Sequence, residues 1–168
     1  ANNLTFVTDG DITLGVTNVL FGTGTLTFRQ SSANTLIGLG DGQTGALNLT
    51  TLEVARIRDG WTSIVFGRTD STGDINAGAL SWTDALTLQT GAGIININGT
   101  QTMAANALTL RSDADMNLTA NLTGTGTLTL TQSSASTSMA IGAGQTGTLN
   151  FNTADLARLT DGWTTVVF

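Results

Sequence analysis

Two pairs of aspartates are the residues of this sequence best suited to acid–base or cation chemistry. Asp9 and Asp11 occur in the segment DGD, and Asp113 and Asp115 occur in the matching segment DAD. Alternate residues of an extended segment point the same way, so each pair would bring two carboxylates together. Such a pair could bind a cation such as Ca²⁺ or act as general acid and base. Aspartate also starts turns and accepts hydrogen bonds from backbone N–H groups, and this structural role is the interpretation we favour.

Three tryptophans form the second group of candidates, because an exposed indole can stack on a ligand at the surface. Trp61 and Trp163 each follow an Asp-Gly pair and precede an apolar strand, in DGWTSIVF and DGWTTVVF. That position favours covering a corner of the fold over binding a ligand. Trp82 has no counterpart in the other half of the sequence, so a ligand or surface role stays more open for it.

The composition excludes several other kinds of chemistry. The chain has no His and no Cys, so disulfides, thiolate metal sites and a His-assisted nucleophile are excluded. We expect no catalytic residue, no cofactor and no enzyme activity. A net charge of −6 without a basic cluster argues against nucleic acid as a partner. No apolar run reaches the roughly 18 residues of a membrane span, so we expect no membrane insertion.

The sequence repeats itself over a long distance, which bears on how these residues are positioned. Residues 22–66 align without a gap on residues 124–168, at an offset of 102 (124 − 22). Upstream, residues 4–14 match residues 108–118 at an offset of 104, which predicts a two-residue insertion near Val16–Phe21. We therefore expect one domain over 1–168, a fragment of a longer protein, with a first copy at 4–107 and a partial second copy at 108–168.

A shorter period of about 20 residues lies within the long one. It consists of apolar–x–apolar triplets, whose outer residues would face the core while the middle residue faces outward. The first inward column would hold Leu4, Leu26, Leu47, Ile64, Leu86, Leu108, Leu128, Leu149 and Val166, and the second Phe6, Phe28, Leu49, Phe66, Leu88, Leu110, Leu130, Phe151 and Phe168. This pattern predicts an all-β parallel β-helix (β-solenoid) with about 20 residues per coil. A second strand would follow each turn, for example at 11–14 and 93–98.

Two segments depart from the strand pattern and predict short helices of about two turns, at 51–58 and 153–160. Thr51 and Thr153 would cap them, and an acid follows each cap in the first turn, Glu53 and Asp155 respectively. We expect both helices to pack on the side of the solenoid.

Threonines at the middle positions suggest one further surface. The segments 25–27 and 127–129 place two hydroxyls each on one flat face, and such Thr-x-Thr ranks resemble those of ice-binding solenoids. The expected ladder is interrupted, however, as at Ala46 and Asn48. Threonine is also a good strand residue in its own right.

The segments ALTLQTGAGIININGT (85–100), ALTLRSDADMNLTANLTGTGTLTLTQ (107–132) and LTTLEVARIRDGWTSIVFGR (49–68) resemble the repeat regions of filamentous-haemagglutinin-like exoproteins and related giant bacterial adhesins. The resemblance implies a right-handed parallel β-helix, an extracellular place on the bacterial cell surface, and a role in adhesion or matrix assembly. Expected partners are other copies of the same solenoid, end to end or side by side, and host or surface glycans. Two alternatives stay open: a carbohydrate-active lyase or hydrolase using paired Asp, and a self-assembling extracellular filament.

Overall fold

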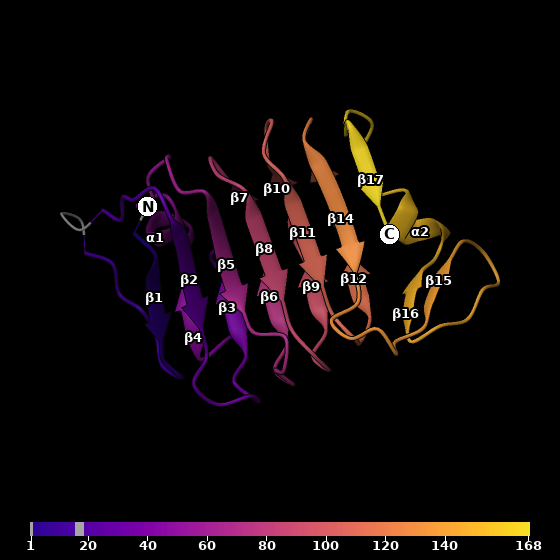
Figure 1. The fold of residues 1–168 in the computed structure, drawn as a ribbon, viewed down its shortest axis with the longest axis horizontal. Helices are drawn as coiled ribbons and strands as arrows, with labels where there is room; N and C mark the ends of the chain where they lie inside the picture. Colours follow the sequence, from indigo (N-terminus) through magenta and orange to yellow (C-terminus); the bar gives the residue numbers. More distant parts are fainter. Residues whose placement is uncertain (1, 16–18) are drawn as a thin grey trace.

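The computed structural model describes residues 2–15 and 19–168, and nearly all of its regular structure is β-strand. The largest sheet has seven strands in chain order, β1 (Leu4–Val7), β2 (Thr25–Arg29), β5 (Ser63–Gly67), β8 (Leu86–Gln89), β11 (Leu108–Arg111), β14 (Thr127–Thr131) and β17 (Thr165–Val167). Figure 1 shows these strands side by side along the long axis of the molecule. This sheet confirms the prediction that the chain is an all-β protein built on parallel pairing.

Three smaller sheets complete the fold. The five-stranded sheet runs in the order β12 (Met116–Leu118), β9 (Ile95–Ile97), β6 (Ile75–Ala77), β3 (Ile37–Leu39) and β4 (Leu47–Leu49). The three-stranded sheet contains β13 (Leu122–Thr123), β10 (Gln101–Thr102) and β7 (Leu80–Ser81), and the two-stranded sheet contains β15 (Met139–Ile141) and β16 (Leu149–Phe151). From β8 to β11 the chain therefore visits the seven-, five- and three-stranded sheets in turn.

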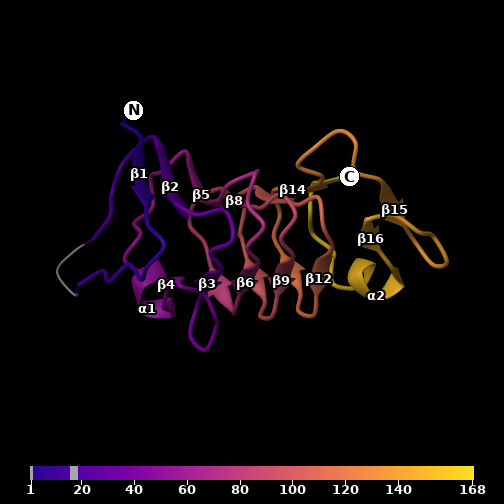
Figure 2. The same ribbon diagram turned by 90° about the horizontal axis from the view of Figure 1, so that it is seen from below.

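The triplets explain why the strands stack in register. Leu86 lies opposite Leu108 and Leu108 opposite Leu128, so like side chains meet in files across the sheet. Leu88 and Leu110 form the neighbouring file and are fully buried, while the middle residues point outward. Figure 2 shows the seven-stranded and five-stranded sheets on opposite sides of the molecule, and the core lies between them. This arrangement is consistent with the predicted parallel solenoid.

Aromatic side chains in one of these files stack on each other. The rings of Phe6 and Phe28 are 5.2 Å apart between centroids, and those of Phe28 and Phe66 are 4.9 Å apart. The planes differ by only 9° and 8°. In-register parallel strands impose this stacking, because identical positions repeat at about 4.8 Å.

The inward columns need one correction. Leu47 and Leu149 do not belong to the seven-stranded sheet, because Leu47 pairs with Ile37 and Leu149 pairs with Met139. The loop after β3 turns the chain back, with positive φ at Gly40 and Gly42, and so places β4 beside β3. The triplet of β2 is therefore followed in the large sheet by the triplet of β5, an offset of 38 residues (64 − 26). Leu49 lies in β4 and Phe151 in β16, so these two residues of the second inward column also lie outside the seven-stranded sheet.

Both predicted helices are present but shorter than expected. They are α1 (Thr51–Val54) and α2 (Thr153–Leu156), a single turn each. The caps lie one residue earlier than predicted, at Thr50 and Asn152, and each forms a capping box with the acid at the third helical position. The helices end early because Ile57 and Leu159 form parallel bridges with Leu20 and Leu122. We call residues 47–61 the first joint and residues 149–163 the second joint.

Other expectations fail near the two ends of the molecule. Residues 11–14 form no strand, although the repeat equivalents of residues 12–14 form β12. The edge strands leave Leu4 36%, Val166 40% and Phe168 41% exposed, so these members of the inward columns are only partly covered. The expected insertion near 16–21 falls in part on residues 16–18, which lie outside the described part of the chain.

Candidate functional site

Asp9, the first aspartate of the DGD segment, accepts hydrogen bonds from the turn at residues 32–35. Its carboxylate accepts hydrogen bonds from the backbone N–H of Ser32 at 2.8 Å, from the Ser32 hydroxyl at 2.7 Å and from the Thr35 hydroxyl at 2.8 Å. Asp9 and Ser32 are 23 residues apart, so the contact joins two neighbouring stretches of the stack. Asp9 therefore occupies the structural role that aspartate plays at turns.

Asp113 repeats this arrangement in the second copy. One carboxylate oxygen accepts hydrogen bonds from the N–H groups of Ser133 at 2.8 Å and Ser134 at 2.7 Å, and from the Thr137 hydroxyl at 2.8 Å. The segment held is again the turn that begins with Gln-Ser-Ser. The repeat thus conserves a carboxylate that ties one turn to the next.

The hydrogen bonds keep both carboxylates ionised. Donors from Ser32 are the main reason why the pKa of Asp9 is lowered. Burial opposes ionisation of Asp113, but the hydrogen bonds from Ser134, Thr137 and Ser133 outweigh it, so the pKa of Asp113 is also lowered. A carboxylate with a lowered pKa is a weak base and a poor proton donor near neutral pH, which argues against an acid–base role for Asp9 and Asp113.

We expect acid to destabilise the fold. The pKa of Asp113 is lower in the folded than in the unfolded chain, so the stabilisation is complete above the unfolded value of 3.8 and is lost as pH falls through the folded value. Urea unfolding at pH 7, 4 and 2.5 should show a falling midpoint. Asp113→Asn should lower the midpoint at pH 7 and reduce its dependence on pH. Equal midpoints for the wild-type chain at pH 7 and pH 2.5 would contradict this account.

The second members of the aspartate pairs have different surroundings. Asp11 is exposed, whereas Asp115 accepts hydrogen bonds through Oδ1 from the N–H groups of Met116 at 3.0 Å and Asn150 at 3.3 Å. Over residues 2–15 and 19–168, no three acidic, His or Cys side chains gather into a cluster that could hold a metal ion. The structure therefore does not assemble Asp9, Asp11, Asp113 and Asp115 into one site.

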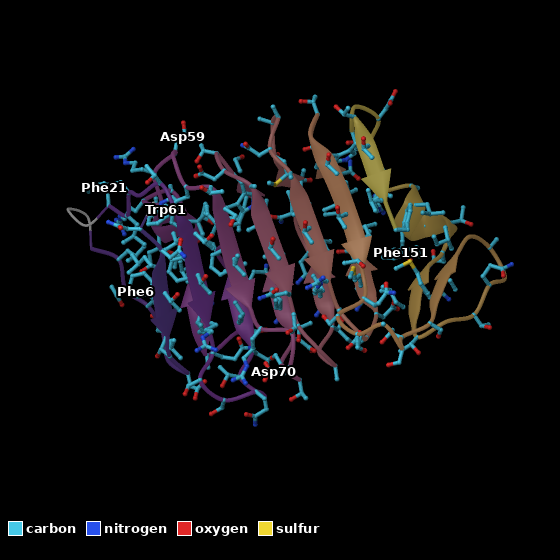
Figure 3. The ribbon with its side chains drawn as sticks, viewed as in Figure 1. Phe6, Phe21, Asp59, Trp61, Asp70 and Phe151 are labelled. Carbon is cyan, nitrogen blue, oxygen red and sulfur yellow. The ribbon has the colours of Figure 1, made fainter. Side chains whose placement is uncertain are left out.

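The two repeated tryptophans cover the joints. Trp61 is only 5% exposed and lies against Gly22, where a Cβ atom would come within 2.4 Å of the ring. Figure 3 shows Trp61 beside the N-terminal end of the large sheet. Trp163 is half-buried over Gly124, and its Nε1 donates to the Leu122 carbonyl at 3.2 Å. The sequence signal for this contact is the glycine that precedes each Thr-Gly-Thr-Leu-Thr segment.

Trp82 also lies in the core, so its ring is not available at the surface for the ligand or surface role that the sequence left open. It is 4% exposed, its Nε1 donates to Gln101 Oε1 at 3.0 Å, and its ring meets that of Phe66 edge-on at 5.8 Å. With Trp61 buried as well, only Trp163 keeps part of its ring accessible among the three candidates.

A column of buried polar side chains was not predicted. Gln30, Ser71, Thr90 and Ser112 are fully buried at the corner that follows the large sheet. The Ser112 hydroxyl donates to the Gly93 carbonyl at 2.7 Å, and the Thr90 hydroxyl donates to the Gly73 carbonyl at 3.0 Å. These side chains satisfy turn carbonyls that no strand can reach. The signal was available, because Gln30, Thr90 and Ser112 each stand two residues after the second apolar residue of a triplet.

The outward face of the large sheet is more regular than the sequence suggested. Once Leu47 and Leu149 are placed elsewhere, the central outward file holds only threonine and valine, at Thr5, Thr27, Val65, Thr87, Thr109, Thr129 and Val167. The interruption at Asn48 disappears, because that residue faces outward from the five-stranded sheet. The result is a flat row of hydroxyl and methyl groups.

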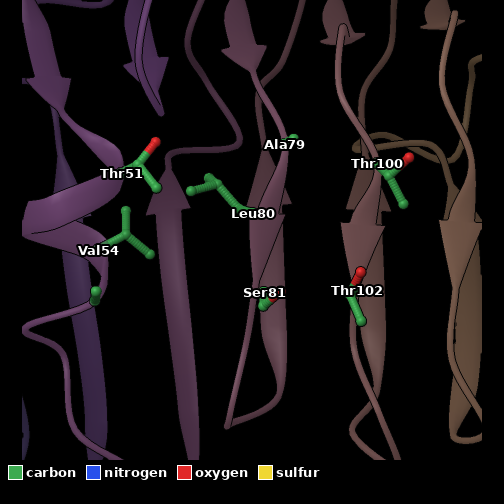
Figure 4. Close-up of a pocket in the computed structure, with 8 residues that line it drawn as sticks. Thr51, Val54, Ala79, Leu80, Ser81, Thr100 and Thr102 are labelled. Carbon is green, nitrogen blue, oxygen red and sulfur yellow. The ribbon is translucent and has the colours of Figure 1, made fainter.

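Shallow grooves flank the joints. One, of about 330 Å³, lies between α1 and the strands β7 and β10, and Figure 4 shows its lining of small hydroxyl and methyl side chains. It is lined by Thr51, Val54, Ala55, Ala79, Leu80, Ser81, Thr100 and Thr102. These groups carry no charge and are not arranged around a reactive centre. A larger groove lies beside α2 at the second joint.

The chain was compared with protein-family models, with curated proteins and with solved structures, and none of the three comparisons gave a match. In the part of the chain that the structure describes, no helix is long and apolar enough to span a membrane.

Proposed function

We propose that this chain is a segment of a right-handed parallel β-solenoid, with about 20 residues per coil, that serves as a structural and adhesive shaft on the surface of a bacterium. The observation that carries the proposal is the continuous file of buried apolar residues across the five central strands of the large sheet, β2, β5, β8, β11 and β14. Such a core needs many stacked rungs to outweigh the entropy of ordering the chain. A shaft has this architecture without needing a reactive centre.

The edges of the large sheet support the proposal that other copies of the same solenoid are partners of this chain. Within the residues that the structure describes, β1 and β17 each have one unpaired side, and Val7 and Val167 are 49% and 42% exposed. Unpaired strand edges favour addition of another parallel strand. In the proposed shaft, further coils or a second copy of the chain cover these edges.

Surface location is the first part of the proposal to test. Antibodies raised against the folded chain should label intact cells of the source bacterium as strongly as permeabilised cells. Preincubating a surface with the purified chain should reduce adhesion of those cells. Labelling that needs permeabilisation would overturn the surface role. Release of sugars from polysaccharides by the chain, lost in Asp113→Asn, would favour the enzymatic alternative instead.

One specific observation favours ice binding as a second candidate. The central outward file of threonine and valine is unbroken across the large sheet, and the strands repeat at about 4.8 Å. A flat array of hydroxyl and methyl groups at fixed spacing is the surface that would order water. Recrystallisation of ice in the presence of the chain tests it, and Thr87→Asp with Thr109→Asp should abolish any inhibition. Ice growth equal to that with albumin would remove this candidate.

A further inference from the structure

The larger groove lies at the second joint and has a volume of about 520 Å³. Binding pockets for small ligands usually measure about 300–1,000 Å³, so the groove has room for one or two sugar rings. Its lining is formed by Asn96, Asn98, Asn117, Leu118, Thr119, Ala154, Asp155 and Arg158. These residues come from β9, β12 and their following turns, and from α2 and the residues just after it.

At the first joint, side-chain contacts close the position that is equivalent to this groove. Glu53 Oε1 accepts a hydrogen bond from the Leu14 N–H at 3.0 Å, and Arg56 donates from Nη1 to the Leu14 carbonyl. Glu53 and Arg56 together therefore satisfy both the N–H and the carbonyl of Leu14. Glu53 is buried in this position.

At the second joint the repeat places Asp155 and Arg158 beside Leu118, but the contacts are not made. Asp155 Oδ2 accepts from the Asn152 N–H at 3.0 Å, and no hydrogen bond joins it to Leu118 within the described residues. The aspartate is one methylene shorter than Glu53. Arg158 is exposed, and its guanidinium has no hydrogen bond or ion pair to any residue that the structure describes.

The backbone groups of Leu118 are left facing this groove. Asp115 accepts from Ile95, and Thr119 donates to Ile97, so alternate residues of β12 bond to β9. Because hydrogen bonding alternates along a parallel strand, the Leu118 N–H and carbonyl point away from β9. The second joint thus lacks, at Leu118, the side-chain partners that Glu53 and Arg56 supply to Leu14 at the first joint, and Leu118 lines the groove with 5% of its surface exposed.

The groups around the groove include both donors and acceptors and carry opposite charges. Asn98 and Asn117 donate through Nδ2 to Gln43 and Asn96, at 2.8 and 2.7 Å, which leaves their Oδ1 atoms available as acceptors. Arg158 supplies donors and is balanced by the carboxylate of Asp155. A ligand rich in hydroxyl groups matches such a set, because each hydroxyl both donates and accepts.

An added peptide strand fits the groove less well. A strand would need alternate N–H groups along the free edge of β12. The Met116 N–H is already bonded to Asp115 Oδ1, which also accepts from the Asn150 N–H. Only Leu118 is left with both groups available, so the edge is too short to hold a strand.

We propose that the groove at the second joint binds a neutral, hydroxyl-rich ligand, a short oligosaccharide, and that the short side chain of Asp155 keeps the groove open. The site goes beyond the role of a shaft and does not depend on it. The first joint, closed by Glu53, has no such site.

The test measures binding of maltohexaose, cellohexaose and mannohexaose to the chain by isothermal titration calorimetry. At least one of them should bind, and Asp155→Glu should weaken that binding at least tenfold, because glutamate reaches the Leu118 N–H as Glu53 reaches Leu14. Arg158→Ala should weaken it by a similar factor. Glu53→Asp, the matched change at the first joint, should leave the affinity unchanged. Circular dichroism melting establishes that each variant is folded, and Asp155→Glu should melt at or above the wild-type temperature.

Three results would overturn the proposal. One is the absence of binding by all three oligosaccharides. Another is equal affinity for the wild-type chain, Asp155→Glu and Arg158→Ala. The third is binding of an extended peptide or of oligogalacturonate at this groove without binding of a neutral sugar. None of these results would bear on the surface labelling that tests the shaft.

Discussion

Leu88→Asp should prevent the chain from folding. Leu88 is fully buried in β8, the central strand of the large sheet. The change removes the burial of a leucine side chain, roughly 1.5–3 kcal/mol, and forces a carboxylate into the core at an effective cost of several kcal/mol. The sum is comparable with the whole stability of a typical domain, about 5–15 kcal/mol. Far-ultraviolet circular dichroism and urea unfolding measure the result.

The neighbouring residue provides the matched control. Thr87 stands on the same strand but points to the outward face. Thr87→Asp introduces the same charge one residue away and should shift the free energy of unfolding by about 0.5 kcal/mol, as exposed substitutions usually do. A folded Leu88→Asp, or equal losses from both changes, would mean that the inward and outward faces are wrongly assigned.

Phe66→Ala should cost about 3–5 kcal/mol of stability while leaving the chain folded at low temperature. Phe66 is fully buried, stacks on Phe28 and meets Trp82 edge-on. Removing the Phe66 ring leaves a cavity between the rings of Phe28 and Trp82. Both the lost burial and the unfilled space contribute to the cost.

Phe21→Ala is the control for this second change. Phe21, labelled in Figure 3, is 77% exposed, so its loss should change the urea midpoint little. Urea unfolding followed by tryptophan fluorescence reports on both variants. A Phe66→Ala midpoint within error of the wild type would contradict the stacked core.

The triplets allowed the sequence to predict the large sheet well. Alternation of period two fixes which residues face the core, and the repetition of Leu-Thr-Leu fixes which strands are equivalent. Leu86, Leu108 and Leu128 therefore fall in one file, as expected. The hydrogen bonds of Asp9 and Asp113 to equivalent turns agree with the structural role that the sequence favours for them.

The placement of Leu47 and Leu149 could not be predicted in the same way. Their triplets look like all the others, and only the short spacing of 17 residues to the next triplet distinguishes them. Which sheet they join depends on the loop after β3 and β15, where glycines with positive φ let the chain turn back. That choice is made by tertiary packing and not by the local pattern.

The candidate groove depends on a difference that the sequence contains but does not explain. Glu53 and Asp155 are aligned in the repeat and differ by one methylene group. Only the structure shows that the longer side chain reaches Leu14 and that the shorter one leaves Leu118 uncovered. Trp82 is a similar case, since its burial depends on Gln101 from a neighbouring strand.

The distance between Thr27 and Thr129 tests the central claim, which is that triplets far apart in the sequence stack in one parallel sheet. These residues are separated by four strand steps, through Val65, Thr87 and Thr109. At about 4.8 Å per step, their Cα atoms should lie about 19 Å apart. The chain has no cysteine, so spin labels can be attached at these two positions through introduced cysteines alone. Electron paramagnetic resonance should give one narrow distribution centred near that distance, whereas a broad distribution or a mean beyond about 30 Å, more than six strand steps, would contradict the stacked sheet.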